Sequence, residues 1–134
     1  MTLIIKRKFV DIIAEHSLEQ YPIEACGILM GEIRQTIRVV LKVFKSKNTI
    51  NSSSRYEIDP EDQLAAFEEA EQKSQEIIGY YHSHPRYTAE PSSIDTAMAF
   101  YKGNSYIIYS VSTRSFKSFL WNGEKFIPEE IKII

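Results

Sequence analysis

Two histidines and an acid close behind them are the residues of this chain whose types and spacing could carry chemistry. His82 and His84 stand at the end of the apolar run "IIGYYHSHP". Because side chains two residues apart in a strand point to one face, both imidazoles can converge on a single ion. Imidazole is a preferred zinc ligand, and Pro85 should end the strand beside solvent. The pair indicates a metal site, with two surface histidines on a loop as the plainer alternative.

A third ligand is needed, because a catalytic zinc usually has three protein ligands and one water. The segment "RYTAEPSSID" supplies a turn, and Asp95 is its natural candidate ligand. If Ser92 is the N-cap of a helix, Asp95 occupies the third helical position and its carboxylate lies over the helix N-terminus. The same "SSID" is also typical of a capping box, in which both side chains serve only the helix. Both interpretations of Asp95 stay open on these residues alone.

The elements that must position these residues show helical and strand patterns in turn. Apolar residues at helical spacing predict two longer helices, and Asp59 before Pro60 is a typical N-cap of the second. The run "EIIGYYH" is apolar on both faces, as a central strand is. The elements expected, in chain order, are a helix over 6–20, strands over 25–31, 36–44 and 55–59, a helix over 60–75, a strand over 76–82, a short helix over 92–102, a hairpin over 105–112 and 115–123, and a last edge strand over 125–134.

This order and the composition bound the class of protein. The pattern predicts a mixed sheet with helices packed on it, α/β or α+β in class, in a single domain over residues 1–134. The net charge of −2 and the short, scattered basic runs do not predict nucleic-acid binding. No apolar run is long enough for a membrane span or a signal peptide, so a cytoplasmic protein is expected.

Two further residues are expected to be structural. Cys26 is the single cysteine, which excludes an intramolecular disulfide and a four-cysteine zinc site. It is expected to be a small buried residue in a strand. His16 lies on the first helix with no metal-type partner nearby in the sequence. Its expected role is structural or solvated.

Taken together, the motifs resemble one family. The run "HSHP", six further residues, Ser92, two residues and Asp95 follow the HxHPx6SxxD pattern of the JAMM (MPN-plus) metallopeptidases. The segment "PIEACGILMG" is similar to the family's upstream motif, with Glu24 at the position of its glutamate. The resemblance extends from Pro22 to about Tyr101. It implies a single MPN-type domain, with a curved, mostly antiparallel sheet flanked by helices, similar to the cytidine deaminase architecture.

The resemblance also implies a role for each motif residue. His82, His84 and Asp95 would ligate one Zn²⁺ per chain, leaving one position for water. Glu24 would take a proton from that zinc-activated water and pass it to the leaving amine, and Ser92 would donate to the developing oxyanion. Only the family pattern singles out Glu24. Reasoning from the residues alone leaves four other acids open, namely Glu32, Glu57, Asp59 and Glu90.

A reaction and partners follow from the same resemblance. Family members hydrolyse peptide or isopeptide bonds after the C-terminal Gly-Gly tail of ubiquitin-like or sulfur-carrier proteins. An extended tail can add to an exposed sheet edge through backbone hydrogen bonds, and the polar loop over 45–54 is a candidate clamp. The short segment between Asp95 and Tyr106 lacks the insertion of larger eukaryotic members, which favours a prokaryotic-type enzyme. A homodimer is one of the states that the resemblance allows.

Three alternatives belong to other classes. A non-catalytic MPN-type scaffold or binding module with a structural metal would not need the full set of motif residues. A nucleoside deaminase needs a PCxxC segment, which a chain with one cysteine cannot supply. A closed structural zinc site needs four protein ligands, and Cys26 would have to be the fourth.

Overall fold

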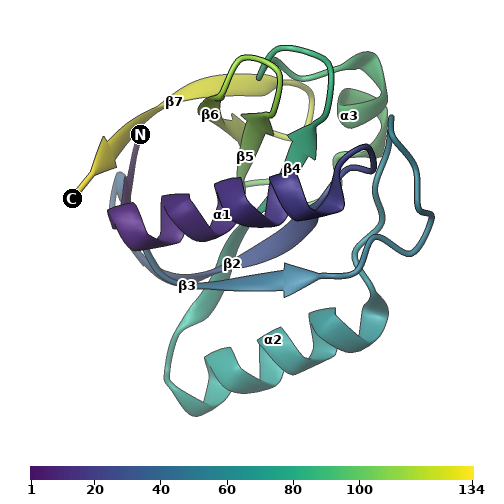
Figure 1. Cartoon of the computed structure of the whole chain (residues 1–134). Helices are drawn as coiled ribbons and strands as arrows, with labels where there is room; N and C mark the ends of the chain where they lie inside the picture. Colours follow the sequence, from purple (N-terminus) through teal and green to yellow (C-terminus); the bar gives the residue numbers. More distant parts are fainter.

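Seven strands close into a barrel in the computed structural model, which describes residues 1–134 (Figure 1). The strand order is β1-β3-β2-β4-β5-β6-β7, and the parallel pairs are β1 with β3, β1 with β7 and β4 with β5. The mixed sheet and α+β class expected from the sequence are confirmed. The elements are β1 (Thr2–Ile5), α1 (Arg7–Gln20), β2 (Cys26–Arg34), β3 (Ile37–Ser46), α2 (Pro60–Gln72), β4 (Glu76–His84), α3 (Ser93–Met98), β5 (Ser105–Ser110), β6 (Ser115–Trp121) and β7 (Phe126–Ile133).

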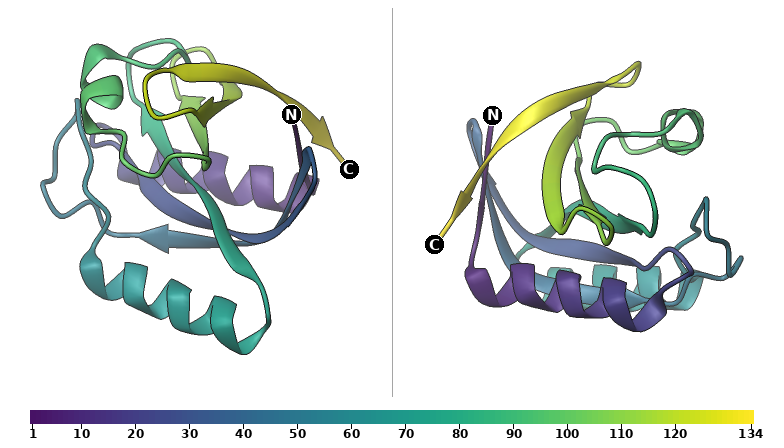
Figure 2. Two further views of the ribbon diagram at one scale, coloured as in Figure 1. Left: turned by 180° about the vertical axis from the view of Figure 1, so that it is seen from behind. Right: turned by 45° about the horizontal axis from the view of Figure 1, so that its top comes forward.

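The two ends of the chain close the barrel. Strand β7 pairs with β6 on one side and with β1 on the other, where Thr2 lies opposite Glu130. Figure 2 shows the N- and C-termini lying close together. The prediction of an edge strand over 125–134 was therefore wrong, and β1 was not predicted at all. The strand "TLII" is too short for a periodic pattern, and its partner strand lies at the opposite end of the chain.

Helices α1 and α2 lie on opposite sides of strands β2 and β3 (Figures 1 and 2). Helix α1 packs against Leu29 and Tyr81, whereas α2 packs Ala66 against Ile28 and Tyr80. Because successive side chains of a strand alternate between faces, β4 directs every second residue toward the side of α2. The two histidines at the end of β4 share the face of Tyr80.

The second helix, α2, begins where it was predicted to begin, but it packs against the sheet partly through other residues than expected. The Asp59 side chain accepts a hydrogen bond from the Glu61 amide, as an N-cap does. Three apolar residues indicated the helix by their spacing: Ala70 is buried, but Leu64 and Phe67 are 59% and 48% exposed. Ala66 is buried in their place. Apolar residues at helical spacing predict a helix, but they do not show which side of that helix packs against the sheet.

Two short segments differ from expectation. Helix α3 ends at Met98 rather than continuing to residue 102. Residues 55–59 form no strand, and a single bridge between Asn48 and Ile58 ties them to the preceding loop. No helix of the structure combines the length and the apolar character that a membrane crossing requires.

Candidate metal centre

Two imidazoles and one carboxylate meet at the end of β4. The Nε2 atoms of His82 and His84 are 3.2 Å apart, and they lie 3.1 and 2.9 Å from the carboxylate oxygens of Asp95. All three residues are buried. They form the one group of histidine, cysteine and acidic residues whose ligand atoms lie close enough to share an ion. The structure thus brings together the three side chains that the sequence predicted as metal ligands.

The start of α3 fixes the carboxylate. The Ser92 hydroxyl accepts from the Asp95 amide at 3.0 Å, and Asp95 accepts from the Ser92 amide at 2.9 Å. Burial raises the pKa of Asp95, but the facing imidazoles and the Ser92 amide outweigh it and hold the pKa well below its usual range. The capping box and the ligand interpretation are compatible, because one carboxylate caps the helix and also faces the histidines.

A hydrogen bond to the backbone sets the tautomer of one histidine. His84 Nδ1 lies 2.7 Å from the carbonyl oxygen of Thr88, which can only accept, so Nδ1 carries a proton. The neutral ring therefore presents the lone pair of Nε2 to the Asp95 carboxylate and to His82. Burial lowers the pKa of His84, but the hydrogen bond to Asp95 outweighs it and raises that pKa, because a proton on Nε2 can stand between the two acceptors. A metal cation would occupy the same place.

The spacing and chemistry of this group fit zinc. The ligand atoms of a tetrahedral zinc, with bonds of about 2.0–2.1 Å, lie roughly 3.3 Å apart. The two imidazole nitrogens are 3.2 Å apart, close to that value, and each lies 3.1 or 2.9 Å from a different oxygen of the Asp95 carboxylate. Two imidazoles with one carboxylate also make a typical three-ligand set of a catalytic zinc site.

Strand pairing brings Glu24 to the same cluster. Glu24 lies two residues before Cys26, which pairs with His82 in the antiparallel register of β2 and β4. Hydrogen bonds join the two segments immediately beyond that pair. Continuing the register places Glu24 opposite His84, and opposite residues of antiparallel strands point to one face.

The environment of Glu24 suits proton transfer. Its side chain is buried, and Oε1 has no hydrogen-bond partner. Burial, followed by the charge of Asp95, raises the pKa of the Glu24 carboxyl to about 8, against an opposing contribution from His84. A carboxyl group with a pKa near neutrality can both accept and release a proton.

The remaining candidate residues lie apart from this cluster or serve the fold. Cys26 is buried and is not among the clustered ligand atoms, so nothing supports it as a fourth ligand. His16 is structural, as one of the two expected roles allowed, since its Nδ1 lies 2.6 Å from the Tyr81 hydroxyl. The four other acids have different surroundings: Asp59 caps α2, Glu90 pairs with Lys117, Glu32 pairs with Arg34, and Glu57 is exposed.

Sequence reasoning missed two residues beside the site. The Tyr56 ring stacks on the ring of His82, with centroids 4.5 Å apart and an interplanar angle of 21°. Asn48 is buried, and its side chain donates to the carbonyl of Glu24 at 3.0 Å. Tyr56 could have been noticed in the sequence as an aromatic residue in an otherwise polar stretch before a helix N-cap.

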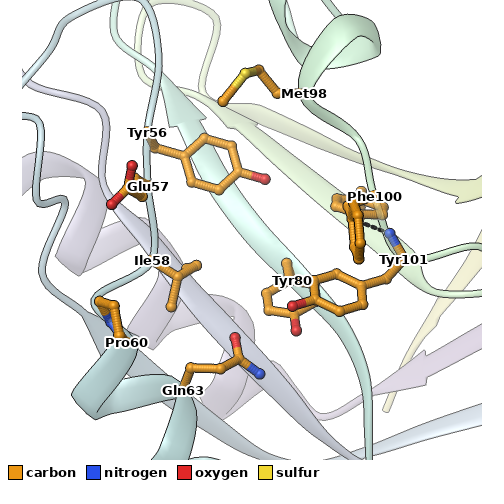
Figure 3. A pocket seen from close by; sticks show the side chains of 10 residues that line it. Tyr56, Glu57, Ile58, Pro60, Gln63, Tyr80, Met98, Phe100 and Tyr101 are labelled. Carbon is orange, nitrogen blue, oxygen red and sulfur yellow. Dashed lines mark hydrogen bonds between the residues drawn. The ribbon is translucent and has the colours of Figure 1, made fainter.

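A cavity of about 370 Å³ adjoins the cluster on the side of Tyr56 (Figure 3). The tyrosine ring forms one wall, and Phe100 and Tyr101 lie across the cavity from it. Two buried polar atoms of lining residues, Tyr80 Oη and Gln63 Nε2, have no hydrogen-bond partner. The cavity is therefore lined mainly by apolar residues, with two polar groups in its wall that lack hydrogen-bond partners.

This barrel with a His-His-Asp cluster at the end of β4 defines the JAMM/MPN class. Residues 6–122 match the family described as prokaryotic homologues of the JAB domain. The match covers most of the chain, and the protein therefore belongs to this family.

Curated relatives agree with the family. A desampylase of Pyrococcus furiosus is 38% identical over 94 residues, covering 70% of this chain and 64% of that protein. A desampylase of Haloferax volcanii is 31% identical over 121 residues, covering 87% and 85% of the two chains. A CysO-cysteine peptidase of Mycobacterium bovis is 29% identical over 112 residues, covering 84% and 74%.

Solved structures share the fold. The solution structure of a protein from Desulfitobacterium hafniense superposes with a TM-score of 0.91 at 30% identity, covering 98% of this chain and 92% of the other. A JAB1/MPN domain protein from Archaeoglobus fulgidus gives a TM-score of 0.62 at 17% identity, covering 98% of both chains. The expected MPN fold is confirmed.

Proposed function

We propose that this protein is a zinc-dependent hydrolase. Its reaction would cleave a peptide or isopeptide bond after the C-terminal Gly-Gly tail of a ubiquitin-like or sulfur-carrier protein. The observation that carries the proposal is the convergence of His82, His84 and Asp95 on one buried point, with the unpartnered carboxyl of Glu24 on the same face. The relatives named desampylase and CysO-cysteine peptidase support the substrate class.

Zinc would be held by His82, His84 and Asp95, and when bound it supplies a Lewis acid that lowers the pKa of a water to near 7. Glu24 accepts the proton of the attacking water and later delivers it to the leaving amine or thiol. Its pKa of about 8 lets the same carboxyl group serve both transfers near neutral pH.

Ser92 supplies a hydrogen-bond donor for the oxygen that becomes negatively charged. Its hydroxyl oxygen already accepts from the Asp95 amide, and the hydroxyl proton stays available. This helix N-cap is only partly buried, so an incoming carbonyl can reach it. Its position in the capping box holds the donor in place before the substrate arrives.

The tail of the substrate would lie along the segment before α2. All seven barrel strands have neighbours on both sides, so the barrel offers no free edge strand for pairing. Residues 52–58 carry one isolated bridge and a few further hydrogen bonds to their backbone, and they lead to Tyr56 and the cavity beside it. An extended tail could form backbone hydrogen bonds there, and the cavity would take an apolar side chain.

Mass spectrometry of cleavage products tests the proposal. Ubiquitin-like and sulfur-carrier proteins with a Gly-Gly tail, each joined to a short peptide, a lysine or a cysteine, would be incubated with the protein, with and without a chelator. We expect zinc-dependent release after the second glycine. It should be abolished by Glu24→Gln and retained by Glu32→Gln, a change in β2, the strand that Glu24 precedes. Cleavage that survives chelation or Glu24→Gln would contradict the assigned chemistry.

A further inference from the structure

The two histidines of the cluster are held in different ways. A histidine that ligates a metal almost always donates its other ring N–H to a hydrogen-bond acceptor, which fixes the orientation of the ring. His84 has such a partner in the Thr88 carbonyl at 2.7 Å. The corresponding atom of His82, Nδ1, is buried and has no partner. On the Nδ1 side of the ring, no hydrogen bond fixes the orientation of His82.

An aromatic ring occupies the place beside His82. Tyr56 lies nearly parallel to the imidazole, with the centroids 4.5 Å apart and an interplanar angle of 21°. Stacking at this distance is favourable and restricts rotation of the imidazole about its χ2 torsion. Tyr56 forms part of the cavity wall (Figure 3), whereas His82 does not line the cavity.

Asn48 fixes the backbone on both sides of Tyr56. Its amide group donates to the Arg55 carbonyl at 3.1 Å, and its oxygen accepts from the Glu57 amide at 3.1 Å. The same amide group donates to the Glu24 carbonyl at 3.0 Å. One buried side chain therefore ties the segment that carries the stacked ring to the segment that carries the carboxyl group of the cluster.

We infer that Tyr56, with its backbone held by Asn48, is the positioning residue that orients His82 for metal binding. The flat face of the ring replaces the hydrogen bond that His82 lacks. The tyrosine hydroxyl is not part of this role. The inference rests on the proposed metal site, because it concerns how one of the ligands is held.

Zinc affinity of variants at this position tests the inference. Loss of a group that orients a ligand typically weakens metal binding by about 10–100-fold. We expect Tyr56→Leu to raise the zinc dissociation constant by that factor, and Tyr56→Phe to stay within about threefold of the wild type. Tyr101→Leu is the matched control, because Tyr101 lines the same cavity without contacting His82, and its zinc affinity should not change.

Affinity would be measured by competition with a chromophoric chelator. Cobalt substitution adds a spectroscopic readout, because the visible absorption bands report the geometry of the ligands. We expect altered bands in Tyr56→Leu alone. The thermal unfolding of each metal-free variant shows whether it is folded. If Tyr56→Leu does not fold, Tyr56→Met, which fills the space with a flexible chain, replaces it with the same expected loss.

The outcomes separate this inference from the proposed metal site. Wild-type zinc affinity and cobalt bands in folded Tyr56→Leu or Tyr56→Met would overturn the inference while leaving the metal site intact. Equal losses in Tyr56→Phe and Tyr56→Leu would also overturn it, since the hydroxyl and not the ring would then be responsible. A wild-type chain that binds no zinc would overturn both.

Discussion

At the scale of single residues, the proposed chemistry uses side chains that are buried without full hydrogen bonding. Glu24 Oε1 and His82 Nδ1 are both buried and unpartnered. Such groups reduce the stability of a fold, and natural proteins keep them mainly where function requires them. Burial of the Glu24 carboxylate should therefore make the unfolding free energy depend on pH.

The first prediction concerns metal-free protein. Because the pKa of Glu24 is raised from 4.5 to about 8, the folded state binds this proton more tightly than the unfolded chain does. The resulting stability is full below about pH 4.5 and is lost as the pH rises through about 8. Relative to Glu24→Gln, the unfolding free energy of the wild type should fall between these limits by at most about 1.4 kcal/mol per pH unit.

Urea denaturation of both metal-free proteins between pH 5 and 8, roughly the interval that linkage assigns to this proton, provides the measurement. Taking the difference between the two proteins removes the contributions of groups that do not interact with Glu24, and leaves those of Glu24 and of its coupling to Asp95 and His84. Parallel pH dependences would show that Glu24 is not buried with a raised pKa.

At the scale of elements, the start of α3 and the end of β4 form one unit. The capping box of Ser92 and Asp95 starts the helix and also directs the carboxylate toward the histidines. A substitution there should therefore affect stability and catalysis together.

Ser92→Ala tests this dual role. Loss of an N-cap serine costs about 1 kcal/mol of unfolding free energy. Loss of the oxyanion donor should lower kcat by about 10²–10³-fold. Ser93→Ala is the matched control, because Ser93 is the exposed first residue of the same helix and its side chain makes no hydrogen bond. Chemical denaturation and steady-state kinetics would measure the two effects, and an active Ser92→Ala variant would remove serine from the mechanism.

Removal of the metal is the next prediction at this scale. The barrel is closed by its own strand pairing, and the cluster lies at one end of β4. Chelation should abolish cleavage and lower the melting temperature, while the far-ultraviolet circular dichroism spectrum stays that of the folded barrel. Global unfolding on chelation would favour the scaffold with a structural metal.

The elements also show how far the sequence could be interpreted. The spacing of His82 and His84 predicts that they share a face, because strand alternation is a local rule. The residues alone left the role of Asp95 open, and the family resemblance made it a ligand. Glu24 could be chosen only by family resemblance, since its approach depends on the pairing of β2 with β4, which lie far apart in the chain. Tyr56 escaped notice for a similar reason, because a loop residue has no period that shows what its ring will touch.

At the scale of the whole molecule, a buried ion pair lies where the barrel closes. Arg38 on β3 lies 3.7 Å from Glu129 on β7, and the Ser118 hydroxyl on β6 donates to Glu129 at 2.7 Å. The two charged side chains are 5% and 0% exposed. The closing pair of β1 and β7 was missed for the same reason as Glu24, since its partners come from the two ends of the chain.

Glu129→Ala should destabilise the barrel strongly. It leaves the Arg38 guanidinium buried without a counter-charge, and loss of one partner of a buried pair typically costs about 3–5 kcal/mol. Glu130→Ala, on the neighbouring exposed position of β7, should change the unfolding free energy by less than about 0.5 kcal/mol. Equilibrium denaturation compares the two variants. Equal stabilities would mean that the ion pair contributes nothing to closure.

The most direct test of the central claim is X-ray absorption spectroscopy of the zinc-loaded protein. We predict one zinc per chain, bound by two imidazole nitrogens, one carboxylate oxygen and one further oxygen from solvent. In His82→Ala, His84→Ala and Asp95→Ala, zinc binding should be lost. A sulfur ligand from Cys26, the single cysteine, would contradict the account. Undiminished zinc binding in these variants would contradict it as well.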